Sequence, residues 1–411
     1  MSAALPEPAP EPAPVAAPVR FRRLEPMPPA HPQPWFPTLP VLGRSGHASA
    51  CLAVDSRFLA ADALLLPSGK VATYWALKDA GVRAGDRVAV PAYHCPTMIH
   101  PIIALRASPH FMPVADDLRI DVEVVRQALR AGVRAVVLPH YFGFLQPDTE
   151  PIVRACRAAG VALVEDCAHA LYARRGSPLP GAWGDYAIAS TRKFIAGAEG
   201  GALAANGRPL AHPRVSPGWI EELRGLRLLL AEARACGALT AFGAGLERTR
   251  AGLARSIGPA DEAEALAEAR PAPAADAEVL ASASPRLALR SVRALVARAD
   301  HAAIAAVRRA RYARWAEVAA GRADVTAFAP CLAAEQVPYV FPLRLSRPRV
   351  QFRALKYRGI AVWRWDQLAE SGCSRSAQLA VSLVQMPCQH SLDDAAFDRL
   401  LREFVAALDG A

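Results

Sequence analysis

Two side chains near the middle of the chain, a carboxylate and an amine, could act on one bound group. Asp166 ends an apolar run within VALVEDCAHA (161–170), and Lys193 follows a second run within GDYAIASTRKF (184–194), 27 residues later. A carboxylate at the end of a buried strand is costly unless a cation pairs with it. A lysine in a desolvated site has a lowered pKa and becomes nucleophilic. Taken singly, each residue has a plainer interpretation, as an exposed strand-end aspartate and a surface lysine.

Lysine is scarce, so any lysine-dependent chemistry has few candidates. The chain holds only four lysines, Lys70, Lys78, Lys193 and Lys356. Ser190 precedes Lys193 closely, and the small residues GAEGGA (197–202) follow it. Such residues let the backbone approach a ligand closely. Lys193 is therefore the candidate reactive amine.

A candidate anion site lies at the start of the helix that we expect over 69–80. Ser68, Gly69 and Lys70 stand there, and a helix N-terminus with a hydroxyl and a glycine attracts phosphate. An ordinary N-cap is the commoner reason for such a sequence. The segment is not a Walker A loop, because Leu64 occupies the position of its first glycine. Amine, carboxylate and phosphate cradle together are what pyridoxal phosphate (PLP) chemistry demands.

Short apolar runs alternate with helical patterns around these residues. This alternation predicts an α/β fold with a mostly parallel sheet between helices, and ligands bind such sheets at the carboxyl ends of the strands. The expected strands are 87–93, 110–115, 135–142 and 161–170, and the expected helices are 69–80, one after Pro96, 121–131 and 149–159.

The chain divides into three parts by composition. Residues 1–34 are rich in Pro and Ala and should form a disordered tail. Residues 35–285 should form the large domain, with a helical insertion at about 211–285. Residues 286–411 should hold one long linking helix (286–319) and a small α+β domain. That domain's expected strands are 337–345, 359–365 and 381–387, and its helices are 349–357 and 393–408.

Composition excludes several classes of protein. With 53% hydrophobic and 21% charged residues the chain should be globular. The net charge is +10, but no basic run is interleaved with aromatics, so we expect no nucleic-acid partner. Charges interrupt the apolar stretch 223–246, which argues against a membrane span. None of the eight cysteines forms a CxxC pair, so no metal site is expected. The absence of a signal peptide predicts a cytoplasmic protein.

Six segments, in this order, resemble the DegT/DnrJ/StrS family of sugar aminotransferases, which have the fold-type I PLP-transferase fold. They are PSGKVATYWAL (67–77), GDRVAVPAYHCPTMIHPI (85–102), PHFMPVADD (109–117), VLPHYFGF (137–144), VEDCAHA (164–170) and STRKF through GAEGGAL (190–203). Six ordered motifs are far more specific than any single one.

The resemblance implies a role for each residue. Lys193 matches the lysine that holds PLP as a Schiff base and shuttles protons, and Asp166 matches the partner of the pyridine nitrogen. His169 falls beside the cofactor's phenolic oxygen, with a packed helix histidine as an equal alternative. Ser190 and the Ser68–Lys70 segment are the expected phosphate ligands.

A residue that stacks on the cofactor ring is expected shortly after Pro91. Tyr93, His94 and Cys95 compete for this position. Strict counting from Pro91 favours Cys95, but a cysteine stacks poorly. We therefore predict His94 or Tyr93.

The expected activity is amino transfer from glutamate or glutamine to a keto sugar, often nucleotide-linked, by a homodimer. The segment SPRLALR (284–290) would replace the one by which a neighbouring subunit reaches the site. Three alternatives stay open: another PLP reaction that uses the lysine, a regulatory protein on the same scaffold, and an α/β protein without a cofactor.

Overall fold

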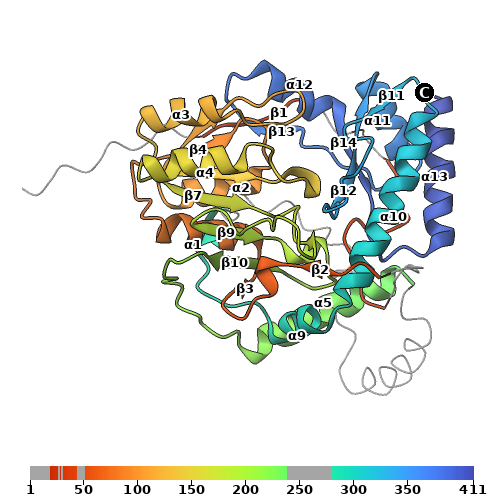
Figure 1. Ribbon diagram of the computed structural model, residues 1–411. Helices are drawn as coiled ribbons and strands as arrows, with labels where there is room; N and C mark the ends of the chain where they lie inside the picture. Colours follow the sequence, from red (N-terminus) through yellow and green to blue (C-terminus); the bar gives the residue numbers. More distant parts are fainter. Residues whose placement is uncertain (1–18, 26–27, 29–30, 44–50, 238–278) are drawn as a thin grey trace, which may run out of the picture.

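The computed structural model describes residues 19–25, 28, 31–43, 51–237 and 279–411. Figure 1 shows two parts beside each other. One part holds a large sheet and its helices, and the other holds a small sheet with α10 (His301–Ala320) and α13 (Asp394–Asp409). The predicted α/β fold with a smaller C-terminal α+β part is confirmed.

The large sheet has seven strands in the order β3-β10-β9-β7-β6-β4-β5. The strands from β9 to β5 are all parallel, whereas β10 runs antiparallel to β9 and β3. Their bounds are β3 (Leu64–Leu66), β4 (Arg87–Pro91), β5 (Ser108–Met112), β6 (Ala135–Pro139), β7 (Ala162–Asp166), β9 (Tyr186–Ala189) and β10 (Gly201–Ala205).

Both faces of this sheet are buried, which explains why its strands are continuous apolar runs. Val88 and Val90 of β4 pack with helices α1 (Gly69–Asp79) and α2 (Pro96–Ala104). Ala89, between them, faces the opposite core with α3 (Val122–Arg130) and α4 (Thr149–Ala158). The alternation follows from the two-residue period of a strand.

The small sheet has the order β11-β12-β14, with bounds β11 (Val325–Ala327), β12 (Val340–Leu345) and β14 (Leu383–Pro387). Helices α11 (Pro348–Tyr357), α12 (Ser374–Ser382) and α13 lie in the same region. The core of this part surrounds Trp315 of α10, whose ring contacts Phe341, Phe397 and Phe404. The domain boundaries stay predictions.

The single linking helix expected over 286–319 is wrong. Two helices occupy this stretch, α9 (Arg290–Arg298) and α10. The backbone is extended at Ala299, which ends α9, and the Asp300 side chain accepts a hydrogen bond from the Ala303 amide to begin α10. Aspartate caps helices in this way.

The disordered tail expected over 1–34 is wrong for part of its length. Strand β1 (Phe21–Arg23) pairs antiparallel with β13 (Gln367–Ala369). The strand expected at 359–365 is also wrong, since only Trp363 forms a bridge there, to Gln385. Residues 1–18 lie outside the described residues.

The expected insertion is described only in part. Helix α5 (Trp219–Ala235) lies below the large sheet in Figure 1, and residues 238–278 lie outside the described residues. The remaining strands, β2 (Val54–Asp55) and β8 (Ala173–Arg174), pair with each other. Among the described helices, none combines the length and apolar character that crossing a membrane requires.

Candidate active site

A pocket at the carboxyl ends of β6 and β7 brings three of the predicted site residues together. Asp166, His169 and Lys193 line it, and Cys95 and Trp365 complete part of its wall. The volume of the pocket is about 40 Å³. It lies where a parallel sheet is expected to bind its ligand.

Asp166 ends β7, and its half-buried side chain reaches this pocket. Its Oδ1 accepts a hydrogen bond from the Ala168 amide at 2.9 Å. Burial raises the pKa of the carboxyl group, and the attraction of Lys193 opposes this rise only in part. A carboxylate in this position is therefore stabilised by any further cation that enters the pocket.

Lys193 ends the short helix η3 (Thr191–Lys193), which follows β9. Burial lowers the pKa of its amino group, although the thiol of Cys95 and the carboxylate of Asp166 act in the opposite direction. Its Nζ lies 5.3 Å from the ring centroid of Tyr339. A lysine with a lowered pKa holds more of the neutral amine that attacks a carbonyl carbon.

Arg308 of α10 holds the backbone of Lys193. Its Nη2 donates to the Lys193 carbonyl at 2.7 Å, and its Nη1 donates to the Tyr339 carbonyl at 2.8 Å. The guanidinium group is fully buried over the ring of Phe194, and burial lowers its pKa to about 10. The sequence could not reveal this residue, because α10 carries several arginines and their spacing favours none of them.

His169 is buried against the rings of Phe142, Tyr339 and Trp365, which together form an aromatic wall. Its ring stacks on Tyr339, with centroids 4.5 Å apart, and its Nδ1 accepts a hydrogen bond from the Phe142 amide at 3.3 Å. Burial lowers the pKa of the imidazole well below its usual range. The ring is therefore neutral with its proton on Nε2. His169 is both a packed histidine and a residue of the pocket, so the two interpretations of the sequence are compatible.

The loop after β6 has a strained backbone and contacts the segment that leads into β12 of the small sheet. Phe142 has a φ of 59°, which bulky residues rarely adopt. Its carbonyl accepts a hydrogen bond from the Tyr339 amide at 2.8 Å. A Cβ atom at Gly143 would lie 2.5 Å from the Val337 carbonyl oxygen, so only glycine fits there. Strain of this kind is found at functional sites, where the surrounding structure maintains it.

The expected phosphate ligands lie together, outside the lining of the pocket. Ser68 caps α1 by accepting a hydrogen bond from the Val71 amide at 3.3 Å. A Cβ atom at Gly69 would lie 3.7 Å from Cβ of Ser190, so Ser190 flanks the helix start together with Lys70. Ser190 also begins η3, and its carbonyl accepts from the Lys193 amide at 3.2 Å. The cradle and the lysine are thus joined by one turn of chain.

The prediction that His94 or Tyr93 stacks on a cofactor is not supported by the geometry. His94 faces away from the pocket, because its Nδ1 approaches the Pro91 carbonyl at 3.1 Å and its Nε2 accepts from the Ala369 amide at 3.0 Å. Tyr93 is buried in the core behind. Cys95, the residue that strict counting favours, lines the pocket instead.

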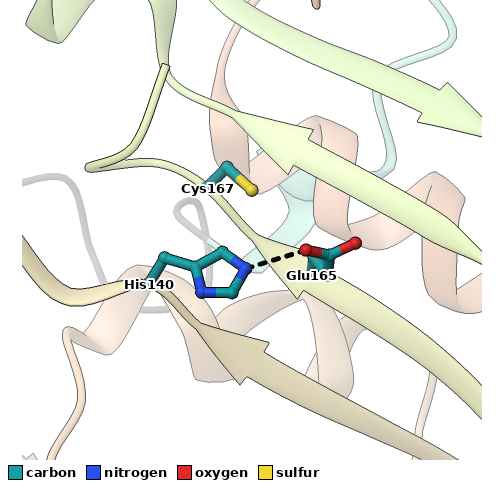
Figure 2. A group of neighbouring side chains, drawn as sticks. All are labelled: His140, Glu165 and Cys167. Carbon is teal, nitrogen blue, oxygen red and sulfur yellow. Dashed lines mark hydrogen bonds and ion pairs between the residues drawn. The ribbon is translucent and has the colours of Figure 1, made fainter. Parts of the chain in front are cut away.

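His140, which also lines the pocket, forms a cluster of potential metal ligands with Glu165 and Cys167 (Figure 2). Glu165 is fully buried, and its two oxygens accept four hydrogen bonds. The donors are His140 Nε2 at 2.8 Å and the amides of Gly181, Trp183 and Gly184 at 3.0, 2.6 and 2.6 Å.

Both ring nitrogens of His140 form hydrogen bonds, and the thiol of Cys167 is buried. Nδ1 of His140 accepts a hydrogen bond from the Gln146 amide. Its Nε2 therefore carries the ring proton and donates a hydrogen bond to Glu165. Burial raises the pKa of the Cys167 thiol well above its usual range. We conclude that the cluster has a structural role, because the hydrogen bond between His140 and Glu165 connects the end of β6 to β7. Sequence reasoning missed Glu165, which directly precedes Asp166.

The protein thus has an α/β fold with a lysine and an aspartate near the carboxyl ends of its strands, the edge at which such sheets bind ligands. Residues 57–213 match the model of the DegT/DnrJ/EryC1/StrS aminotransferase family. The resemblance inferred from the six motifs is thereby confirmed.

Two curated relatives match part of the chain. GDP-perosamine synthase of Vibrio cholerae is 29% identical over 147 residues, which cover 35% of this chain and 40% of the relative. L-glutamine:2-deoxy-scyllo-inosose aminotransferase of Streptomyces fradiae is 30% identical over 190 residues, or 41% of this chain and 45% of that protein. The chain thus matches less than half the length of each.

Solved structures extend the likeness in fold beyond this segment. NtdA from Bacillus subtilis, solved with bound cofactor PMP (pyridoxamine phosphate), superposes with a TM-score of 0.53 at 13% identity. The match covers 84% of this chain and 73% of NtdA. At this identity the likeness establishes the fold alone.

Proposed function

We propose that this protein is a PLP-dependent aminotransferase that moves an amino group from glutamate or glutamine to a keto sugar. The observation that carries the proposal is the meeting of Lys193 and Asp166 in one pocket, with Ser190, one turn before Lys193, beside the start of α1. The names of the two relatives support an amide donor and a nucleotide-linked acceptor.

The residues fit the cofactor at each of its ends. Lys193 would attach PLP through Nζ, and Asp166 would receive the N–H of the pyridine ring. Ser68, Gly69, Lys70 and Ser190 would hold the phosphate at the N-terminus of α1, where helix amides and a hydroxyl attract an anion. Bound PLP supplies an electron sink for the electron pair released when a substrate carbon loses its proton.

The chain's own groups then have defined tasks. The neutral amine of Lys193 would take the proton from the substrate carbon. Asp166 would stabilise a positive charge on the ring nitrogen of the bound cofactor. His169 would offer its Nε2 proton as a hydrogen-bond donor to an oxygen on the cofactor ring. Trp365 lines the pocket, and the ring of Tyr339 lies 5.3 Å from Nζ of Lys193.

The proposal includes a cytoplasmic homodimer. All eight cysteines belong to the described part of the chain, and each is a free thiol, which is typical of a reducing compartment. Fold-type I aminotransferases, which this chain resembles, act as dimers.

Reduction of the purified protein with borohydride, followed by peptide mapping, tests the proposal directly. We expect a visible absorption band from bound PLP and a modified Lys193. Lys193→Ala should lose the band and the modification, whereas the control variant Lys78→Ala should keep both. If the label were found on Lys70, Lys78 or Lys356, or if added PLP gave no band, the proposal would be wrong. A protein that binds PLP but transfers no amino group from any donor would be a regulator.

A further inference from the structure

A second pocket lies beside the first and shares Cys95 and Trp365 with it. It is larger, with a volume of about 330 Å³. Three cationic side chains line it, those of Arg23, Lys356 and Arg364, against the single carboxylate of Asp366. The charges of its lining therefore do not cancel.

Lys356 is a buried cation on α11. Only 5% of the residue is exposed, and its Nζ lies 5.7 Å from the ring centroid of Phe352. Burial and the neighbouring Arg364 lower the pKa of its amino group, and the attraction of Asp366 opposes this only in part. An ammonium group held beside a second cation in a largely buried site is destabilised, so the site favours an incoming anion.

Arg364 also lies close to the ring of Phe352. Its guanidinium carbon is 3.9 Å from the Phe352 centroid, and the residue is 6% exposed. Its Nε and Oδ2 of Asp366 are 3.5 Å apart, and neither atom has a hydrogen-bond partner in the structure. The pair is thus too loose to satisfy the guanidinium, which retains donors for a ligand.

Other parts of the chain complete the pocket. Arg23 reaches it because β1 pairs with β13, with Arg23 opposite Gln367. Helix α2 begins there at Pro96, without a side-chain cap, so its positive end adds to the field. Trp363, which is 54% exposed, forms an aromatic rim.

We propose that this second pocket binds the phosphate or diphosphate group of the acceptor substrate. The inference rests on the proposed function, because the shared wall places a ligand in this pocket next to the reacting groups. The donor's carboxylate is bonded directly to the carbon that reacts, so it must stay inside the first pocket. A phosphate on a sugar lies several bonds from the keto carbon and therefore needs a separate cationic site.

Binding of pyrophosphate to the full-length protein, saturated with PLP and followed by calorimetry, tests the proposal. We expect Lys356→Met and Arg364→Met to weaken binding at least tenfold, because each removes a buried cation and keeps an apolar side chain of comparable length. Arg353→Met on the same helix is the control. Arg353 is exposed and outside the pocket, so its loss should change binding less than twofold.

Arg364→Lys should retain most of the binding, which separates charge from damage to the fold. Equal affinity of the wild type, Lys356→Met and Arg364→Met, or no binding at all, would overturn the proposal. Displacement of pyrophosphate by glutamate would also overturn it, because the pocket would then hold the donor's carboxylate. Pyrophosphate binding that depends on Lys356, in a protein that fails to take up PLP, would support the pocket while rejecting the proposed function.

Discussion

Arg308 Nη2 donates a hydrogen bond to the main-chain carbonyl of Lys193 at 2.7 Å, although 115 residues separate the two. The same guanidinium donates to the carbonyl of Tyr339, whose ring lies under Nζ of Lys193. Arg308 therefore connects the proposed reactive lysine, the aromatic wall and α10. We regard it as a positioning residue, because no contact with a reacting atom is involved.

Arg308→Met should lower both stability and turnover. The substitution leaves two buried carbonyls without a donor, and each such loss costs about 1–3 kcal/mol. We expect a lower kcat with a nearly unchanged KM for the amino donor, while borohydride still labels Lys193. Arg314→Met is the control, since Arg314 forms a half-exposed pair with Asp398 worth about 1 kcal/mol or less. A purely structural role would reduce stability and leave the kcat of the folded enzyme unchanged.

Asp166→Asn should abolish most of the activity while the cofactor stays attached. The amide removes the negative charge that stabilises a protonated ring nitrogen, and losing one preorganised electrostatic partner costs about 10²–10³-fold in rate. The measurement is single-turnover conversion of the PLP form with glutamate, together with the visible spectrum. Unchanged turnover would show that Asp166 does not face the cofactor.

Gly201→Ala should weaken PLP binding through the phosphate cradle. A Cβ atom there would lie 2.1 Å from the carbonyl carbon of Ser68 and 2.6 Å from the Gly69 amide nitrogen, so the start of α1 must move. We expect at least a tenfold higher Kd for PLP in a titration of the apoprotein. Gly321→Ala, where the nearest atom would be 3.7 Å away, should bind PLP like the wild type. Normal affinity in Gly201→Ala would place the phosphate elsewhere.

Ionised Glu165 should stabilise the fold, so the free energy of unfolding should fall at acidic pH. Its hydrogen bonds with His140 and the loop amides outweigh the cost of burial and lower the pKa of the carboxyl group below the usual 4.5. Because the folded pKa is lower than the unfolded one, the stabilisation is complete above about 4.5 and is lost as the pH falls through the folded value. Urea unfolding of the wild type between pH 7 and acidic pH should show this loss.

Glu165→Gln is the matched variant for that experiment. Breaking a buried pair from one side costs about 3–5 kcal/mol, so we expect a clear loss of stability at pH 7. The difference between the wild type and the variant should shrink on acidification, because only the wild type has a charge to lose. A constant difference at every pH would contradict the assigned ionisation.

The sequence predicted the large sheet and its helices closely, because buried parallel strands are apolar throughout and two of the helices, α1 and α3, begin at a side-chain cap. The helix expected at 121–131 is α3 (Val122–Arg130), with Asp121 as its cap. Asp166 and Lys193 could be singled out because one ends a buried strand and the other lies in the short helix that follows a buried strand. The stacking position stays a prediction, because spacing does not determine which way the adjacent side chains Tyr93, His94 and Cys95 point.

The sequence by itself therefore determined the α/β fold and the residues at the strand ends, since both depend on local periodicity and on the cost of burying charge. Tertiary structure alone decided the partners that come from distant parts of the chain. Arg308 reaches the Lys193 backbone through the packing of α10. Arg23 reaches the second pocket through the pairing of β1 with β13. Such contacts depend on how elements pack in space, and no local pattern encodes them.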